Sequence, residues 1–312
     1  MQATNHILLI RPANFNFNSQ TAISNAFQQL SNESELATRQ AAINEFDAFA
    51  KKIAAKGVNV TIIEDTLFPP KPDAIFPNNW VSFHADGKVI LYPLCAPNRR
   101  PERRIDIIEK LKEKFLVKEV IDLSYYEKEN RFLESTGSIV FDRENKIAYA
   151  CLSPRTDKNI FIEVCNLLQY KPIYFTANDK NGQAIYHTNV MMCVGSSFCV
   201  ICLESITDKQ ERETICNSLI STGHQIIDIS FEQTSNFAGN LLELSTGQEQ
   251  NVLVLSQTAY ENLHPKQKTT LENLVELLPV PIKTIETIGG GSARCMIAEI
   301  FLDRLVQQSS VA

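Results

Sequence analysis

Long hydrophobic runs are missing from this chain of 312 residues. No stretch reaches the roughly 18 consecutive apolar residues that a membrane-spanning helix needs. The N-terminus, MQATNHILLIRPANF, has no cluster of basic residues and only a short apolar run, so it lacks the plan of a signal peptide. We therefore expect a protein that is neither secreted nor held in a membrane.

A strong charge of one sign is also absent. The 30 basic and 36 acidic residues are mixed along the sequence and leave a net charge of −6. No basic stripe of the kind that binds nucleic acid stands out, so we expect no nucleic-acid partner. Charged residues make up 21% and hydrophobic residues 44% of the chain, which excludes a disordered chain or a coiled coil as its main description.

Cysteine is too sparse for a disulfide scaffold, with eight residues that lie mostly in or beside apolar segments, as small buried side chains do. This usage favours a reducing, cytoplasmic setting. Cys199 and Cys202 form a CxxC pattern, but in a strand residues three apart point to opposite faces, so we expect no metal site. The motifs GxGxxG, GxxxxGK[ST] and GxSxG are absent, and we expect no cofactor.

What the sequence does contain is a repeat. A pair of small or polar residues followed by a short apolar strand occurs five times, at steps of 51 to 59 residues. A β-rich segment precedes each copy, and a further strand follows each of the first four. A helical pattern follows each of these strands, and a fifth follows the N-terminal segment 6–12. One residue marks each copy: Asn79, Ser138, Asn189, Asn240 and Cys295. The β-rich segments are 58–64, 119–126, 171–177, 224–230 and 279–286, the further strands 88–94, 146–153, 198–206 and 251–258, and the helical patterns 35–56, 101–116, 158–169, 207–220 and 260–277.

The fifth copy lacks its further strand, and the N-terminal segment 6–12 has the missing pattern. The first and last units then share one module, which closes a ring. Because one sheet cannot bury both of its faces alone, the units must pack around a common axis. We predict a single domain, residues 1–312, with the α/β fold of a closed, pseudo-symmetric propeller of five units. An ordinary α/β sandwich with chance similarity is the alternative, and segment 296–306 fits either a strand or a helix.

The repeat brings chemistry-bearing residues to equivalent places near the predicted axis. A thiol, an imidazole and a carboxylate make up an activated cysteine nucleophile: the His carries protons and the carboxylate fixes its tautomer. Each residue also has a simpler explanation, namely core packing for the Cys and turn or capping roles for the others. Cys295 follows three glycines, which let the backbone approach a ligand closely. The candidate site residues are Cys295, His187, Glu134 and Asp73.

At these residues the sequence resembles the guanidino-modifying, or pentein, superfamily of arginine deiminases, dimethylarginine dimethylaminohydrolases and amidinotransferases. The resemblance extends over nearly the whole chain and is greatest to the short dimethylaminohydrolase-like members. His187 and Cys295 match the catalytic His and the near-terminal catalytic Cys of that superfamily. The other matching segments are Pro-Asp-Ala-Ile-Phe at 72–76, Ala-Pro-Asn-Arg-Arg-Pro-Glu at 96–102, Leu-Glu-Ser-Thr-Gly at 133–137 and Leu-Ser-Pro-Arg-Thr-Asp at 152–157.

The resemblance implies a pentein fold and a role for each residue. Cys295 attacks the carbon of a guanidinium or ureido group, and His187 protonates the leaving nitrogen and then activates water. Glu134 orients His187 and supports its charge. Asp73 accepts hydrogen bonds from the substrate's nitrogen donors. Arg99 and Arg155 are candidates to bind the α-carboxylate of an amino-acid substrate.

Two departures from the arginine deiminase pattern concern the charge of the substrate. Where those enzymes have F-x-R-D and H-x-D, this chain has Phe-Pro-Asn-Asn ending at Asn79 and His-Thr-Asn ending at Asn189. A buried guanidinium without paired anions is costly. A neutral ureido group needs a donor and an acceptor facing it, and Asn supplies both. We therefore expect a ureido substrate such as citrulline, similar to the citrulline ureidase branch, with Asn79 and Asn189 in its binding site.

Several alternatives stay open at this point. Asp73 is retained, so arginine or methylarginine hydrolysis is possible, and the residues do not distinguish water from an amine as the acceptor in an amidino transfer. A non-enzymatic rival is the pentein-like translation factor that binds ribosomes. The set of Cys295, His187 and Glu134, together with the acidic net charge, argues against it. The sequence leaves the oligomeric state open.

Overall fold

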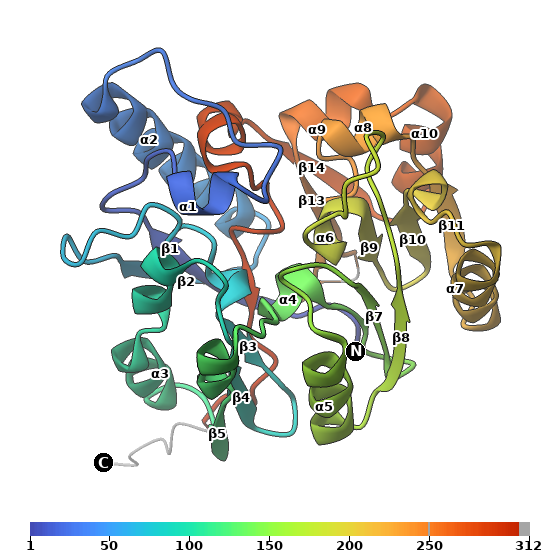
Figure 1. Cartoon of the computed structure of the whole chain (residues 1–312), viewed down its shortest axis with the longest axis horizontal. Coiled ribbons are helices and arrows are strands. Elements are labelled where there is room, and N and C mark those ends of the chain that lie inside the picture. The colour runs from blue at the N-terminus through green and yellow to red at the C-terminus, as the bar shows by residue number, and fades with distance from the viewer. Residues whose placement is uncertain (249, 306–312) are drawn as a thin grey trace.

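The computed structural model describes residues 1–248 and 250–305, and within them the strands form five separate three-stranded sheets. All five are built alike: the strand that follows a marker is antiparallel to the second strand, and a third strand is parallel to the second (Figure 1). Four sheets follow the chain in order: β3 (Val81–Phe83), β4 (Lys88–Leu91) and β5 (Glu119–Asp122); β6 (Val140–Asp142), β7 (Ile147–Cys151) and β8 (Lys171–Phe175); β9 (Met192–Val194), β10 (Phe198–Ile201) and β11 (Gln225–Asp228); β12 (Leu242–Leu244), β13 (Val252–Ser256) and β14 (Glu276–Val280).

The fifth sheet joins the two ends of the chain. Its strands are β15 (Ala298–Glu299), β1 (His6–Arg11) and β2 (Asn59–Glu64), with Ile7 paired to Glu299 and Leu9 paired to Ile62. The prediction that segment 6–12 completes the last unit is therefore confirmed. Segment 296–306, for which strand and helix were both open, contains a short strand at Ala298–Glu299. Residue 306 lies outside the described part.

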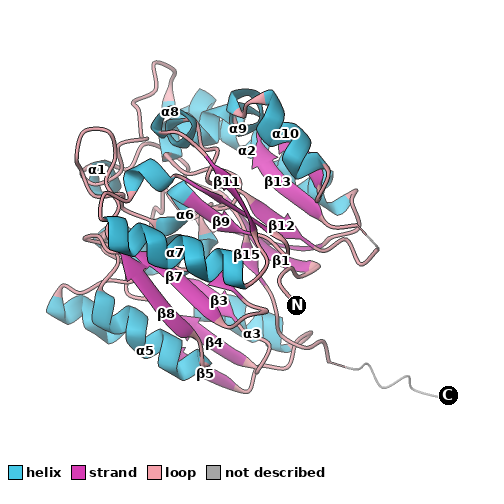
Figure 2. Ribbon diagram, turned by 90° about the vertical axis from the view of Figure 1, so that its right-hand side faces the viewer, coloured by secondary structure: helices cyan, strands magenta, loops and turns pink. Residues whose placement is uncertain are grey.

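A helix connects the second strand of each sheet to the third, because two parallel strands need a long crossover. The long helices lie on the outside of the strands (Figures 1 and 2). In α2, the residues Phe46, Phe49, Ala50 and Ile53 form the buried face at helical spacing, and Ser34 caps its first turn. The connecting helices are α2 (Glu35–Ala54), α3 (Ile105–Lys112), α5 (Lys158–Leu168), α7 (Lys209–Ser221), and α9 (Gln257–Asn262) with α10 (Pro265–Glu272).

Three differences from the sequence predictions have local causes. The strand that precedes each marker belongs to the sheet of the preceding unit, because it follows that unit's crossover helix. The helix expected at 260–277 is divided into α9 and α10, since Pro265 has no N–H and instead begins α10. The strand expected at 279–286 lies earlier, at β14, and a single π-helical turn, η5 (Ile285–Gly289), takes its second half.

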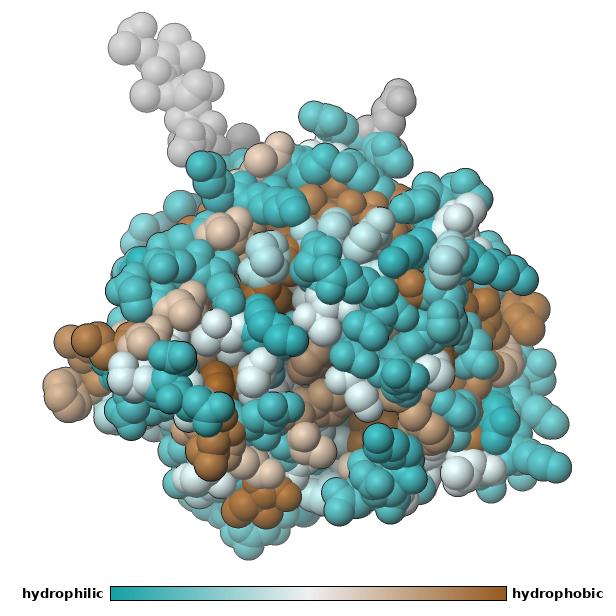
Figure 3. Space-filling model, turned by 90° about the horizontal axis from the view of Figure 1, so that it is seen from above, coloured by the Kyte–Doolittle hydropathy of each residue, from teal (hydrophilic) through white to brown (hydrophobic). Residues whose placement is uncertain are grey.

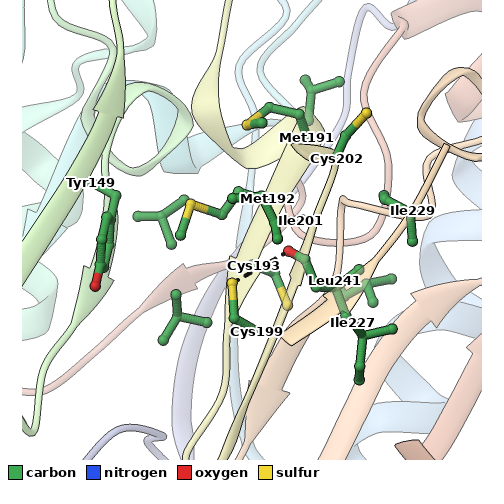
Figure 4. Packing of buried hydrophobic residues seen from close by; sticks show 14 of the residues in the cluster. Tyr149, Met191, Met192, Cys193, Cys199, Ile201, Cys202, Ile227, Ile229 and Leu241 are labelled. Carbon is green, nitrogen blue, oxygen red and sulfur yellow. Dashed lines mark hydrogen bonds between the residues drawn. The ribbon is translucent and has the colours of Figure 1, made fainter. Parts of the chain in front are cut away.

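The cysteines outside the site pack mostly as small hydrophobic side chains. Cys193 and Cys199 lie on neighbouring strands among Met192, Ile201 and Leu241 (Figure 4). All eight cysteines are free, and only Cys95 and Cys216 are partly exposed. Seen from the side of α1 and α8, the surface is largely hydrophilic with scattered hydrophobic residues (Figure 3).

Short helical elements occupy the centre of the molecule, each just before the first strand of a sheet. These are η1 (Pro77–Asn79), α4 (Ser135–Ser138) and α6 (Thr188–Met191), and α4 contacts both of the others (Figure 1). The last residue of η1, Asn79, and the last residue of α4, Ser138, are two of the repeat markers. Equivalent places in the repeat are thus adjacent in space.

The five sheets remain distinct in their hydrogen bonding. One isolated bridge, between Phe83 and Ile300, links neighbouring sheets, and among the described residues no strand ladder joins all five into a barrel. The observed fold is a mixed α/β fold of five equivalent sheets, and the closed five-unit propeller and the single-domain organisation remain predictions. Within the same residues, no helix is both long and apolar enough to cross a membrane.

The role of β1 as a central strand can be tested by measuring the free energy of unfolding of variants. Leu9 is fully buried, whereas its paired neighbour Ile62 on the outer strand is 45% exposed. We expect Leu9→Ala to lower the free energy of unfolding by about 2–5 kcal/mol, because it leaves a cavity in the core. Ile62→Ala, the matched control in the same sheet, should cost about 1 kcal/mol or less. Denaturant unfolding of both variants measures this, and equal losses would contradict it.

Candidate active site

Cys295 lies after the glycine-rich loop, three residues before the start of β15, and is 5% exposed. Its N–H donates to the carbonyl of Ser292 at 2.9 Å, which forms a tight turn. Two side-chain amides face the thiol: Nδ2 of Asn189 lies 3.4 Å and Nδ2 of Asn240 lies 3.3 Å from Sγ. Both amides donate hydrogen bonds to the sulfur.

His187, Glu134 and Arg155 form a buried row. Nε2 of His187 lies 2.8 Å from Oε2 of Glu134, and Nη1 of Arg155 donates to the same oxygen at 3.5 Å. The backbone N–H of Cys95 donates to the other oxygen, Oε1, at 3.0 Å. Glu134 and His187 stand immediately before α4 and α6, respectively, so the helix starts fix both side chains.

The pKa shifts of Glu134 and His187 indicate which atoms of this row carry protons. Burial opposes the ionisation of Glu134, but the Arg155 charge and the His187 hydrogen bond outweigh it and hold the pKa of that carboxyl well below its usual range. Burial lowers the pKa of His187 to about 4, although Glu134 acts in the opposite direction. An ionised carboxylate only accepts hydrogen bonds, so Nε2 of the neutral ring carries the proton and Nδ1 is left as the base.

A second group of charges surrounds Asp73. Arg99 makes two hydrogen bonds to Glu102, at 2.9 and 2.8 Å, and its Nη1 donates to Oδ1 of Asn79 at 2.7 Å. The guanidinium also lies 3.7 Å from Oδ2 of Asp73. Burial raises the pKa of Asp73, and the charge of Arg99 partly offsets that effect. All four side chains are at most 3% exposed.

The segment between β1 and α2, residues 13–34, covers this group, and we call it the covering segment. It includes the short helix α1 (Ser19–Ala22). Asn18 and Thr21 donate to Oδ2 of Asp73 at 2.7 and 3.1 Å. Arg155 donates to the carbonyl of Thr21 at 2.9 Å and to the hydroxyl of Ser24 at 2.6 Å. The covering segment thus contacts a site anion and a site cation at once.

Several buried polar atoms in the site have no hydrogen-bond partner within the described part of the chain. They are Nδ2 of Asn79, Oδ1 of Asn189, Oδ1 of Asp73 and both amide atoms of Asn78. Since an unsatisfied buried polar atom costs about 1–3 kcal/mol, a group of them around a thiol indicates a place for a polar ligand.

Gly137 explains how the two halves of the site approach each other. A Cβ atom at this position would lie 2.4 Å from Nδ2 of Asn79 and 2.9 Å from Nδ1 of His187. Both distances are shorter than real Cβ contacts, so only glycine permits this arrangement of the amide beside the imidazole.

The sequence-predicted residues are all buried and fall into three contact groups. Cys295 contacts Asn189, Glu134 contacts His187 and Arg155, and Arg99 contacts Asn79 and Asp73. Sequence reasoning gave no site role to several further members, although Asn240 is a repeat marker and Glu102 and Asn78 lie in motifs described above. The others are Asn18, Thr21, Ser24 and Tyr186, whose ring lies against His187 and whose hydroxyl donates to the carbonyl of Gly290 at 3.0 Å.

A separate cavity of about 360 Å³ lies beside the covering segment. Phe27 and Tyr186 form part of its wall, and Cys295, His187 and Glu134 do not line it. Tyr186 therefore belongs to both places, because its ring also contacts His187. No group of three or more His, Cys, Asp or Glu side chains suited to a metal ion occurs in residues 1–248 and 250–305.

Comparison with known families gives a match over nearly the whole chain. Residues 11–302 match the family model described as N,N dimethylarginine dimethylhydrolase, eukaryotic. None of the curated protein sequences matches the chain.

Solved structures share the fold at low sequence identity. ArgZ, an arginine dihydrolase from the ornithine–ammonia cycle in cyanobacteria, has a TM-score of 0.74 at 15% identity in its apo structure; the match covers 97% of this chain and 41% of ArgZ. The N-terminal domain of ArgZ bound to its product also has a TM-score of 0.74 at 15% identity and is covered to 97%, with 95% of this chain. An adduct of dimethylarginine dimethylaminohydrolase with S-methyl-L-thiocitrulline has a TM-score of 0.64 at 15% identity, covering 96% of this chain and 100% of that one.

The lowered pKa of His187 makes stability depend on pH. The ring titrates at about 6.5 in the unfolded chain and at about 4 in the fold, so between these values the unfolded chain binds the extra proton. The free energy of unfolding should therefore fall by up to about 3 kcal/mol from this group as the pH drops through that window. The pKa of Glu134 is lowered from 4.5, so protonation of this carboxyl reduces the free energy of unfolding further only at lower pH.

Denaturant unfolding between pH 4 and 7 measures this dependence. His187→Gln keeps a donor for Glu134 but does not titrate, so its slope in this window should be smaller than that of the unmodified protein. His264→Gln, at an exposed position, is the control and should leave the slope unchanged. Equal slopes for the unmodified protein and His187→Gln would show that the fold does not hold this ring neutral.

Proposed function

Since the chain belongs to the N,N-dimethylarginine dimethylhydrolase family, whose members hydrolyse carbon–nitrogen bonds other than peptide bonds, we propose that it hydrolyses the ureido group of a free amino acid, with citrulline as the substrate. Cys295 is the nucleophile, His187 the general acid and base, and Glu134 the carboxylate that orients His187. Asn79 and Asn189 bind the ureido group.

The observation that carries this proposal is the orientation of the Asn79 amide. Its oxygen accepts a hydrogen bond from Arg99, which is itself fixed by Glu102, so its Nδ2 donor is left without a partner. A guanidinium has only N–H donors and would meet this donor unfavourably, whereas a ureido carbonyl accepts from it.

Asn189 supplies the complementary group. Its Nδ2 faces the Cys295 thiol and its Oδ1 has no partner, so an acceptor is free for a ureido N–H. Of the three acidic side chains of the site, Glu134 is paired with Arg155, and Glu102 and Asp73 share Arg99. These pairings reduce the negative charge that would favour a cationic guanidinium.

The other end of the site is suited to the α-amino and α-carboxylate groups. Oδ1 of Asp73 is a free acceptor for an ammonium, and Arg155 reaches the covering segment, where a carboxylate could replace the oxygens of Thr21 and Ser24. Arg99 was also predicted to bind the α-carboxylate, and that prediction stays untested. Its bonds to Glu102 and Asn79 favour a role in orienting Asn79.

The proposed reaction has two steps. Nδ1 of His187 takes the proton of the Cys295 thiol as Sγ attacks the ureido carbon. His187 then passes this proton to the δ-nitrogen as the bond from that nitrogen to the carbon breaks, so that ornithine leaves and a carbamoyl group stays on the sulfur. His187 then takes a proton from water, which attacks the carbamoyl carbon and releases the thiol and carbamate. Carbamate decomposes to ammonia and carbon dioxide, so one citrulline and one water give ornithine, ammonia and carbon dioxide.

The test is the choice between citrulline and arginine. We expect kcat/KM for citrulline to exceed that for arginine, measured as release of ornithine, citrulline and ammonia, with methylarginines and agmatine included. Restoring carboxylates with Asn79→Asp and Asn189→Asp together should move the preference toward arginine. A charge-assisted hydrogen bond is worth about 1.5–3 kcal/mol, so two correspond to a shift of up to ~10²–10⁴-fold.

Controls separate the possible outcomes. Cys295→Ala should abolish hydrolysis, while Cys193→Ala, at a buried cysteine outside the site, should retain it. Efficient turnover of arginine with none of citrulline would disprove the ureido assignment and favour an arginine hydrolase. Transfer of the group to an added amine would indicate an amidinotransferase. No turnover of any substrate, with Cys295 inert to alkylation, would favour a binding protein.

The approach of Asn79 to His187 gives a second test. Gly137→Ala would place a methyl group against both side chains, so we expect the rate of hydrolysis to fall by roughly 100-fold or more. Gly182→Ala is the matched control, because its Cβ would meet nothing within 4 Å, although its φ of +79° makes the change somewhat strained. Circular dichroism should show both variants folded. Full activity in Gly137→Ala would mean that this close approach is not needed for catalysis.

A further inference from the structure

A buried carboxylate outside the catalytic row supports the loop that carries Cys295. Glu286 lies in the π-helical turn η5 and is 2% exposed. Its Oε1 accepts a hydrogen bond from the hydroxyl of Ser292 at 2.6 Å, and its Oε2 accepts one from the hydroxyl of Thr258 at 2.7 Å. Thr258 belongs to the helix α9 (Gln257–Asn262).

Ser292 connects this carboxylate to the nucleophile. Its side chain is held by Glu286, and its backbone carbonyl accepts the N–H of Cys295 at 2.9 Å. The turn from Ser292 to Cys295 then places Sγ against the amides of Asn189 and Asn240. A displacement of Ser292 would therefore move the sulfur relative to both amide donors.

The loop also has backbone anchors, because the side chains of Asn25 and Tyr186 donate to the carbonyl of Gly290 at 3.1 and 3.0 Å. Gly289, Gly290 and Gly291 separate Glu286 from Ser292, and they have no side chains that could anchor the backbone. Side chains are also excluded there: a Cβ at Gly289 or Gly291 would lie within 3.0 Å of the Phe76 ring, and Gly290 has a φ of +63°. The bond from Glu286 to Ser292 spans the three glycines and restrains the Ser292 side chain.

Glu286 is unusual among the buried carboxylates of the site region. Glu134 is paired with Arg155 and Glu102 with Arg99, whereas no ion pair to Glu286 occurs among the described residues. Burial raises its pKa, and the hydroxyl partners and the charge of Lys283 only partly offset that effect. A carboxylate is nevertheless well suited here, because its two oxygens accept from two hydroxyls at once.

We propose that Glu286 is a positioning residue for catalysis: through Ser292 it fixes the turn that holds the Cys295 thiol against the amides of Asn189 and Asn240. This inference rests on the proposed role of Cys295 as the nucleophile. Glu286 touches neither the thiol nor the predicted substrate groups in the contacts described, so it acts only through Ser292.

The test compares the two hydroxyl partners of the same carboxylate. Glu286→Ala and Ser292→Ala should each lower kcat by roughly 10- to 100-fold with KM little changed, because a misplaced nucleophile slows the chemical step more than binding. Glu286→Gln should retain part of the activity, since an amide still bonds to a hydroxyl. Thr258→Val removes the other partner only and should keep kcat near that of the unmodified protein, even where it lowers the thermal midpoint.

Two further measurements separate positioning from loss of folding. Rates are divided by the folded fraction of each preparation, measured by circular dichroism, so that unfolded molecules do not count. The double variant Glu286→Ala, Ser292→Ala should lose no more kcat than either single variant, because both act through one bond. Additive losses, an unchanged kcat in Ser292→Ala, or an equal loss in Thr258→Val would overturn the proposal.

The labelling rate of Cys295 keeps this result distinct from the proposed function, because it needs no substrate. Labelling with iodoacetamide should proceed at a different rate in Glu286→Ala than in Thr258→Val if the turn positions the thiol. If Cys295→Ala retained activity, the nucleophile assignment would fail. If Cys295→Ala were inactive while Glu286→Ala kept full kcat and the unmodified labelling rate, only the positioning role would fail.

Discussion

The ionised carboxylate of Glu134 is the group on which the part of the site around His187 depends. It is fully buried, and it is stabilised there by His187, Arg155 and the backbone N–H of Cys95. Because it stays ionised, it can only accept hydrogen bonds, and this fixes which nitrogen of His187 carries the proton. Breaking a buried pair of this kind by removing one partner leaves an unpaired charge and typically costs about 3–5 kcal/mol.

Arg155 extends this interaction to the covering segment. One side of its guanidinium contacts Glu134, and the other side contacts Thr21 and Ser24. Thr21 also donates to Asp73, so the segment bonds to both an arginine and an aspartate of the site. An amino acid presents the same combination of ammonium donors and carboxylate acceptors, and it would therefore exchange with the covering segment for the same two side chains.

The five equivalent sheets explain how groups so distant in sequence meet. Before the first strand of each sheet, the chain makes a short turn at the centre of the molecule. The marker residues lie in or beside these turns. Asn189, Asn240 and Cys295 come from three such turns and contact one another through the thiol. The glycine at 137 and the glycines at 289–291 leave the space in which these turns approach so closely.

Much of this organisation follows from the sequence alone, because it depends on local and periodic patterns. The repeat spacing predicted the equivalent units, the missing fifth strand predicted the pairing of β1 with β15, and apolar spacing located helices such as α2 and α7 to within a few residues. The candidate residues Cys295, His187 and Glu134 were found because their positions in the repeat and in short motifs are equivalent. The local sequence pattern predicted β14 too late in the chain and predicted α9 and α10 as one helix, because short helical and strand patterns overlap around Pro265.

The tertiary structure alone decided the contacts between side chains that are far apart in sequence. No local pattern shows that Arg99 turns the Asn79 amide, that Ser24 meets Arg155 across 131 residues, or that Asn240 faces the Cys295 thiol. Periodicity specifies which face of an element is buried, but not the rotamer of a polar side chain within that face. The orientation of an amide depends on its neighbours from other units, and those neighbours are fixed only when the sheets have packed together.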